Sequence, residues 1–124
     1  MEIVSFEIAK KLKEKGFREM TLSFYMLSIK HPLFPFTYSL KDWNKTDNCY
    51  SAPTISQVLK WLREEKGMYI QITLFEYCYD YCILDTKMVY YDNEHKVLHQ
   101  GPTGYSYDEA ALAGIEYIID NNLI

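Results

Sequence analysis

The sequence lacks the residue patterns that mark most catalytic and metal centres. It contains no nucleophile elbow, no P-loop and no dinucleotide-binding fingerprint. No CxxC pair occurs, and Cys78 and Cys82 would be roughly 13 Å apart on one strand with a rise of ~3.3 Å per residue. That separation is too large for a shared zinc ion. We therefore expect a chain that is not an enzyme and that holds no metal and no cofactor.

Histidine is also scarce, with three residues in the chain. His95 and His99 lie near a predicted strand end beside Asp92 and Glu94, which leaves open a role in metal binding or proton transfer. A hydrolase-like activity would need one of these histidines beside a carboxylate in a cleft. Turn residues of these types are more often simply hydrated.

The chain has no long hydrophobic run and only three cysteines, an odd number. The first fifteen residues carry charges too early and too densely for a signal peptide or a membrane span. Free cysteines without a secretory signal favour a reducing compartment. We expect a cytoplasmic protein with no membrane association.

Positive charge is scarce in the second part of the chain. Residues 1–75 hold 11 Lys or Arg and 8 Asp or Glu, whereas residues 76–124 hold 2 and 9. Phosphate contacts dominate nucleic-acid affinity, so the acidic C-terminal part disfavours a general nucleic-acid binder. A basic patch around Lys10, Lys11, Lys13 and Lys15 remains an alternative to an ordinary solvated helix surface.

What the sequence does contain is a well-marked helix followed by a strand, in residues 51–74. Thr54 and Gln57 have the spacing of a capping box. An apolar stripe follows along one helix face, and Gly67 can adopt the left-handed conformation that ends a helix. The members of the stripe are Ile55, Val58, Leu59 and Leu62, with Trp61 at its edge.

The residues after Gly67 alternate with a period of two, as in a half-buried strand. One face would carry Met68, Ile70, Ile72 and Leu74, and the other Tyr69, Gln71, Thr73 and Phe75. A strand that follows a helix through one glycine usually folds back beneath it. We expect the apolar stripe of the helix to cover the Met68 face.

Helices are also predicted at the two ends of the chain. Ser5 is a candidate N-cap for a helix that runs to about Lys15, with Gly16 at its end. Ser106 and Glu109 form a second capping box that opens a C-terminal helix, whose small residues allow close approach to a sheet.

Residues 18–50, about a quarter of the chain, are the segment whose structure the sequence predicts least clearly. Partial alternation suggests a strand that has Leu22, Phe24 and Met26 on one face. Pro32 and Pro35 prevent a regular central strand between them. Phe34 and Phe36 either cover the core edge or form an exposed patch, and residues 41–48 read as a polar loop around Trp43.

Two further strand-like runs follow residue 74, at 77–84 and 87–91, with a turn expected at Asp85 to Lys87. A second turn at Asp92 to Glu94 precedes a strand around Val97 to His99. The expected fold is therefore α+β and forms one domain over residues 1–124. An antiparallel meander of three or four strands packs against the central and C-terminal helices, with an additional N-terminal helix.

Tyrosine is unusually frequent, with 12 residues, eight of them in the predicted strands and at the entry to the last helix. One interpretation is that Tyr69, Tyr79 and Tyr81 form an aromatic platform that stacks a nucleotide ring. Tyrosines are also rigid anchors in protein interfaces, and they pack well within sheets without any binding role. The candidate binding residues are Tyr69, Gln71, Phe75, Tyr79 and Tyr81.

Three blocks of the chain, FEIAKKLKEKGF, SAPTISQVLKWLREEKGMYIQI and YSYDEAALAGIEYIIDNNLI, are similar to blocks of a known family. This family consists of short uncharacterised proteins of phages, prophages and mobile elements of gut bacteria. The blocks cover about half of the chain, and residues 18–50 do not match. The resemblance implies a compact helix, helix, sheet, helix domain encoded by an accessory gene, and it supplies no catalytic residue.

The functional hypothesis from the sequence is a non-enzymatic phage or mobile-element accessory protein that binds a protein. The partner would be a host factor, a defence component or a second copy of the chain. The alternative is a small nucleotide or nucleic-acid binding module that uses the strand tyrosines, provided that they are exposed beside positive charge.

Overall fold

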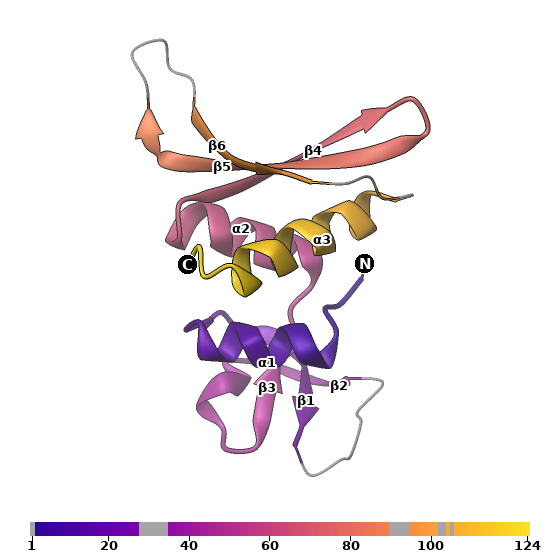
Figure 1. The fold of residues 1–124 in the computed structure, drawn as a ribbon. Helices are drawn as coiled ribbons and strands as arrows, with labels where there is room; N and C mark the ends of the chain where they lie inside the picture. The colour runs from indigo at the N-terminus through magenta and orange to yellow at the C-terminus, as the bar shows by residue number, and fades with distance from the viewer. Residues whose placement is uncertain (1, 28–34, 90–94, 102–103, 105) are drawn as a thin grey trace. The chain divides into compact units, whose positions relative to one another are not determined.

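The computed structural model describes residues 2–27, 35–89, 95–101, 104 and 106–124 (Figure 1). These residues form three α-helices and two antiparallel three-stranded sheets, which confirms the expected α+β class. The chain divides into two compact units, Met1–Gln57 and Val58–Ile124, and each is described by itself. The expectation that both belong to a single domain stays a prediction.

The first unit begins with α1 (Phe6–Glu14), as the sequence predicts. The Ser5 hydroxyl accepts a hydrogen bond from the Ile8 amide at 3.4 Å, and this satisfies one of the free donors of the first turn. Gly16 has a φ of 86°, the left-handed conformation that terminates a helix. The Phe17 amide then donates to the Leu12 carbonyl, and the Phe17 ring is completely buried.

The first sheet has the order β2-β1-β3, with β1 (Thr21–Met26), β2 (Phe36–Lys41) and β3 (Cys49–Ser51). The buried positions of β1 are Thr21, Ser23 and Tyr25, whereas Leu22 is 54 % exposed. The burial of β1 is therefore opposite to what its hydrophobicity suggests. Hydrogen bonds explain it, because the hydroxyls of Thr21 and Ser23 and the phenol of Tyr25 each find a partner inside the unit.

Trp43 is buried, and it does not lie in a polar loop as the sequence suggested. It opens the short 3-10 helix η1 (Trp43–Lys45), and its indole Nε1 donates to the Thr21 carbonyl at 3.0 Å. Phe24 stacks on it with ring centroids 4.0 Å apart. Phe36 in turn stacks on Phe24 but is 43 % exposed, and Phe34 lies outside the described residues.

The helix α2 (Ile55–Glu65) begins in the first unit and continues into the second. Its capping box is formed as predicted. The Thr54 amide donates to Gln57 Oε1 at 2.9 Å, and the Gln57 amide donates to the Thr54 hydroxyl at 3.2 Å. The chain leaves the helix through Gly67, which has a φ of 66°.

The second sheet has the order β4-β5-β6, with β4 (Met68–Phe75), β5 (Cys78–Val89) and β6 (His95–Gln100). The three-stranded meander expected from the sequence is present. The turn expected at Asp85 to Lys87 is wrong, because β5 continues through these residues as one strand of 12 residues. Its pairing with β6 instead contains a register shift between Asp85 and Val89. The turn expected at residues 92–94 lies outside the described residues.

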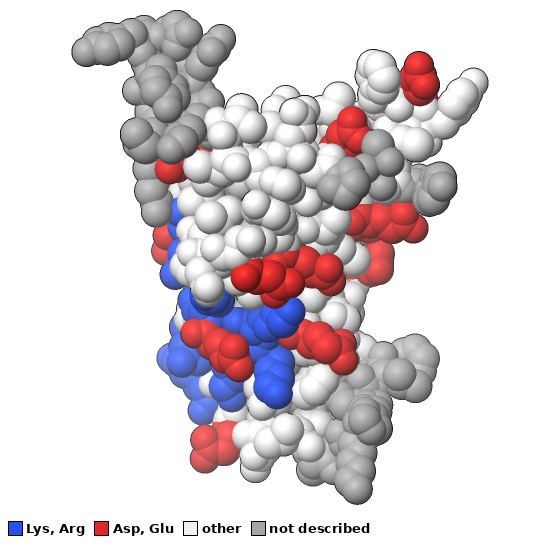
Figure 2. All heavy atoms as spheres, in the orientation of Figure 1, with Lys and Arg blue, Asp and Glu red and all other residues white. Residues whose placement is uncertain are grey.

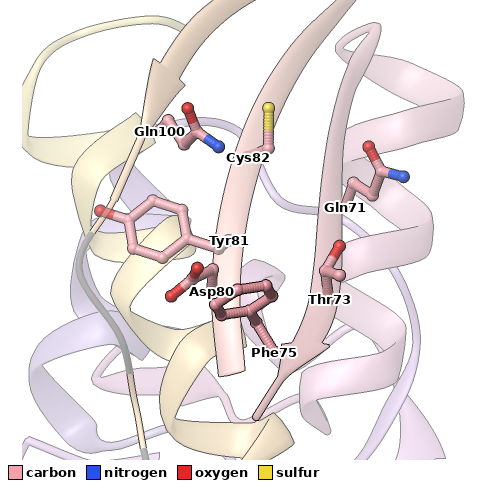
Figure 3. A pocket seen from close by; sticks show the side chains of 7 residues that line it. All are labelled: Gln71, Thr73, Phe75, Asp80, Tyr81, Cys82 and Gln100. Carbon is pink, nitrogen blue, oxygen red and sulfur yellow. The ribbon is translucent and has the colours of Figure 1, made fainter. Parts of the chain in front are cut away.

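The helix α3 (Tyr107–Asp120) follows the sheet and packs on one of its faces, on the same side as α2 (Figures 1 and 3). The Ser106 hydroxyl accepts from the Glu109 amide at 3.1 Å, as the sequence predicts. Gly114 lets the helix approach closely, since a Cβ there would lie 3.0 Å from Ile70 and 3.3 Å from Tyr81. Gly101 is more tightly constrained, because a Cβ there would overlap atoms of the Tyr81 ring.

None of the helices in the described part of the chain is long and apolar enough to cross a membrane.

Candidate functional site

The register of the second sheet decides which side chains share a face. Directly paired residues point to the same side of an antiparallel sheet. Ile70 pairs with Ile83 and Ile72 with Tyr81, and this face meets α3 at Gly114. The residues of the opposite face, called the open face here, are Tyr69, Gln71, Thr73, Phe75, Cys78, Asp80, Cys82, Leu84, Val97 and Gln100.

Three large side chains on the open face are exposed, whereas Leu84 is half-buried. Phe75 is 66 % exposed, Val97 56 % and Tyr69 38 %. On the covered face, in contrast, Met68, Ile70 and Ile83 are at most 6 % exposed. Figure 3 views the open face directly, with the helices behind the strands. The alternation predicted for residues 68–75 is confirmed, except that Leu74, near the hairpin tip, is 58 % exposed.

A pocket of about 230 Å³ lies on the open face (Figure 3). Thr73 is directly opposite Asp80 across β4 and β5, and Cys82 is opposite Gln71 on one side and Gln100 on the other. The residues that line the pocket are Gln71, Thr73, Phe75, Asp80, Tyr81, Cys82 and Gln100. Hydrogen-bonding groups from three strands therefore meet beside one aromatic ring.

Asp80 is the charged residue of the open face. One of its carboxylate oxygens, Oδ1, is shielded from solvent and has no hydrogen-bond partner among the described residues. A shielded carboxylate oxygen without a donor is unfavourable, because desolvation is not compensated. Asp80 therefore brings a carboxylate to the pocket whose Oδ1 carries an uncompensated desolvation cost among the described residues.

Cys82 lies in the same pocket, and burial raises the pKa of its thiol. A raised pKa keeps the sulfur protonated at neutral pH, whereas a nucleophilic cysteine needs a lowered one. The Cys82 environment therefore lacks the feature that activates a catalytic thiol.

Only part of the predicted binding set lies together. Tyr69, Gln71 and Phe75 are on the open face, as expected from their alternation. Tyr79 pairs with Leu74 and Tyr81 with Ile72, so both point to the opposite face. The idea that Tyr69, Tyr79 and Tyr81 form one aromatic platform is therefore wrong.

Tyr81 is also inaccessible, with 3 % of its surface exposed. Its ring fits against Gly114 of α3 and over Gly101. Burial raises the pKa of its phenol, and the nearby Tyr117 phenol raises it further. Tyr81 therefore belongs to the core of the second unit.

The histidines give no separate site in the described part of the chain. His99 is on the face covered by α3 and stacks on Tyr117. The side chain of His95, together with Asp92 and Glu94, lies outside the residues described. Among the residues that are described, no three His, Cys, Asp or Glu side chains are placed to hold a metal ion.

Positive charge gathers around α1 in the first unit (Figure 2). Lys13 is engaged there, since its Nζ donates to the Cys49 carbonyl at 2.9 Å and lies 4.9 Å from the centre of the Tyr50 ring. Lys13 thus has a structural role. The open face in the second unit includes neither Lys nor Arg among its ten residues.

Sequence reasoning missed Asp80, Cys82 and Gln100 as neighbours of Gln71 and Thr73. A signal was present in β5, because Cys78, Asp80 and Cys82 alternate with Tyr79 and Tyr81 and so must lie on the other face. No protein-family model, no curated protein and no solved structure matches this chain.

Proposed function

We propose that this chain is a non-enzymatic phage or mobile-element accessory protein that acts by binding another protein on the open face of its second sheet. The observation that carries the proposal is a sheet face on which Tyr69 and Phe75 are exposed and Phe75 lines a polar pocket. The accessory role is supported by the resemblance of three sequence blocks to the family of short phage and mobile-element proteins.

The composition of the open face suits a protein partner. Protein interfaces are enriched in aromatic residues and depleted in charge at their centres. Tyr69 and Phe75 supply large, rigid contact areas that lose little conformational entropy on binding. Asp80 is the only charged residue among the ten of this face.

The polar pocket supplies specificity. A partner side chain that enters the pocket and donates a hydrogen bond to the Asp80 carboxylate would add a directional contact there. Arginine, lysine and amide side chains are donors of this kind, and a charged donor makes the stronger bond. Partners without a donor at this place would leave the carboxylate desolvated and unpaired, so they would bind less tightly.

The nucleotide-binding alternative has less support. It requires exposed tyrosines beside positive charge, but Tyr79 and Tyr81 point away from Tyr69, and the open face carries Asp80 and no Lys or Arg. A carboxylate there repels phosphate groups. A thermal-shift panel of nucleotides and short oligonucleotides is expected to leave the melting temperature unchanged.

Photo-crosslinking tests the protein-binding role. A benzoyl-phenylalanine placed at position 75 or 71 is expected to give one specific covalent adduct in the bacterial host with a mass that differs from a multiple of the chain mass, besides any adduct between two copies of the chain. The same crosslinker at Glu116, which is exposed on α3, serves as the matched control. Asp80→Asn in the position-75 background is expected to weaken the adduct by about tenfold, because one charged hydrogen bond is lost.

Two outcomes would contradict the proposed role. One is the absence of any adduct from positions 71 and 75. The other is an equal pattern of adducts from position 116, which would show that the open face is not the binding surface.

A further inference from the structure

The outer edge of β4 is an unprotected strand edge. Within the described residues, β4 pairs with β5 on one side and with no strand on the other. The pairing with β5 runs without a bulge from Met68 opposite Asp85 to Phe75 opposite Cys78. The outer edge is therefore regular along the whole strand.

Edge strands of natural sheets usually carry features that prevent pairing with another chain, such as lysine, proline, bulges or short length. β4 has none of these features. Its eight residues, MYIQITLF, include no charged residue, no proline and no glycine. A long, regular and uncharged edge of this kind readily accepts another strand.

A groove of about 290 Å³ follows this edge. Four consecutive residues of β4, Tyr69 to Ile72, line it together with Leu59 and Arg63 of α2 and Tyr107 of α3. Consecutive strand residues point to opposite faces, so four in a row can line a groove only along the edge. The groove therefore has the shape of a site for an extended chain segment, bound by main-chain hydrogen bonds.

We propose that the occupant is β4 of a second copy of this chain, paired antiparallel about a two-fold axis at Ile72. In this register Tyr69 faces Phe75 of the second copy, and Gln71 faces Thr73. On the other side of the sheet, Ile70 faces Leu74 and Ile72 faces its own counterpart. From Tyr69 to Phe75, each aromatic, polar and aliphatic side chain thus meets one of its own kind, and such cross-strand pairs stabilise a sheet.

The exposed fractions agree with this pairing. Phe75 and Leu74 are 66 % and 58 % exposed in the single chain, and both acquire an apolar neighbour in the paired sheet. A two-fold axis also makes the contact closed, because each copy gives and receives the same strand. The result is a six-stranded sheet with one continuous open face built from two copies.

The charged residues near the two ends of β4 are also consistent with pairing between two copies. Arg63 lies at the start of the groove, because α2 runs directly into β4 through Gly67. In the proposed register Glu76 of the second copy follows Phe75 and comes to this end, opposite Met68. Arg63 and Glu76 are both exposed, so each copy offers one positive and one negative side chain to the other.

This inference rests on the proposed protein-binding role and names a second copy as one partner. Sedimentation equilibrium and light scattering between about 1 and 300 µM are expected to give twice the 14.7 kDa of a single chain at the upper concentrations. A mass of one chain throughout that range would overturn the inference. It would leave the proposed role standing if the crosslinker at position 75 still captured another protein.

Charge substitutions at exposed positions test the register. In the double variant Gln71→Lys with Thr73→Lys, the new lysine at position 71 of each copy lies opposite the new lysine at position 73 of the other. The dimer then contains two pairs of like charges, which destabilise the pairing of the two strands. We expect dissociation to be at least about tenfold easier. Gln71→Glu with Thr73→Lys instead places opposite charges in register and sets the lysine at position 73 opposite Asp80 of its own chain, so this matched variant is expected to remain a dimer.

Retention of the dimer by the double-lysine variant would show that another surface forms it, and dissociation of the lysine–glutamate variant would show a different register. Each result would overturn the proposal. Circular dichroism checks that both variants fold. Hydrogen exchange of the unmodified chain gives a readout that needs no variant, because outer-edge amides of β4 should become protected as the concentration rises.

Discussion

The imidazole of His99 lies parallel to the phenol ring of Tyr117, with the ring centroids 3.5 Å apart and the planes at 4°. Tyr81 is a second neighbour of the imidazole, with ring centroids 5.8 Å apart and the planes tilted by 45°. These three rings join β6, α3 and β5 on the covered face of the second sheet. Aromatic contacts of this kind hold the helix on the sheet in addition to the aliphatic core.

Removal of the Tyr117 ring is expected to destabilise the second unit. Tyr117→Ala should lower the free energy of unfolding by about 2 kcal/mol, because a half-buried ring and its stack on His99 are lost. Tyr117→Phe is the control, and it should change the free energy by less than about 0.5 kcal/mol. Urea unfolding followed by circular dichroism measures both, and equal effects of the two variants would contradict a role for the stack.

Stability is expected to fall at alkaline pH. Burial raises the pKa of Tyr25 and of Tyr81 above the ordinary 10.0, with smaller contributions from Glu7 and Tyr117 respectively. A raised folded-state pKa gives a contribution that is fully present below pH 10 and is lost as the pH rises through the folded value. Urea midpoints between pH 8 and 12, with phenolate absorbance, should show this loss, and Tyr81→Phe should make it shallower.

Asn44 is expected to be among the most sensitive positions of the first unit. Its side chain donates to the Phe17 carbonyl at 2.7 Å and accepts from the Ser51 amide at 2.8 Å, all within buried surroundings. Asn44→Ala removes both of these hydrogen bonds to buried backbone groups and should cost about 2 to 4 kcal/mol of stability. Asn121→Ala removes an exposed bond to the Tyr117 carbonyl and should cost less than about 1 kcal/mol. Similar losses in thermal or urea unfolding would contradict this difference.

The hairpin turn between β4 and β5 stores some backbone strain. Glu76 has a φ of 54°, a left-handed conformation that is unfavourable for residues with a Cβ. Glu76→Gly should therefore raise the free energy of unfolding by about 1 kcal/mol. Glu76→Ala keeps the Cβ and tests the loss of charge alone, so it should give no such gain. A glycine variant that is no more stable than the alanine variant would refute the strain argument.

Local signals in the sequence were sufficient for the parts of the fold that depend on nearby residues. The Thr54 and Ser106 caps and the alternation of residues 68–75 follow from spacings of two or three residues. The first sheet did not follow, because Ser23 is buried through a hydrogen bond to Thr37 at 3.1 Å and not through its hydrophobicity. Partners that lie far apart in the chain determine which face of β1 is covered.

The grouping of the candidate binding residues was only partly predictable, for a related reason. The alternation in β4 correctly grouped Tyr69, Gln71 and Phe75. The faces of Tyr79 and Tyr81 depend on the length of the hairpin turn, which is two residues because Phe75 pairs with Cys78. With that length, odd-numbered residues of β4 share a face with even-numbered residues of β5, so Asp80 and Cys82 join the site and the two tyrosines leave it.

The residue at position 101 limits which residue position 81 can hold, and the reverse is also true. The Tyr81 ring occupies the volume that any side chain at residue 101 would need. Chains that diverge from this one while keeping an aromatic residue at position 81 must retain glycine at 101, and a side chain at 101 requires a smaller residue at 81. This paired pattern, some twenty residues apart, is a distinctive criterion for recognising remote relatives of the second unit.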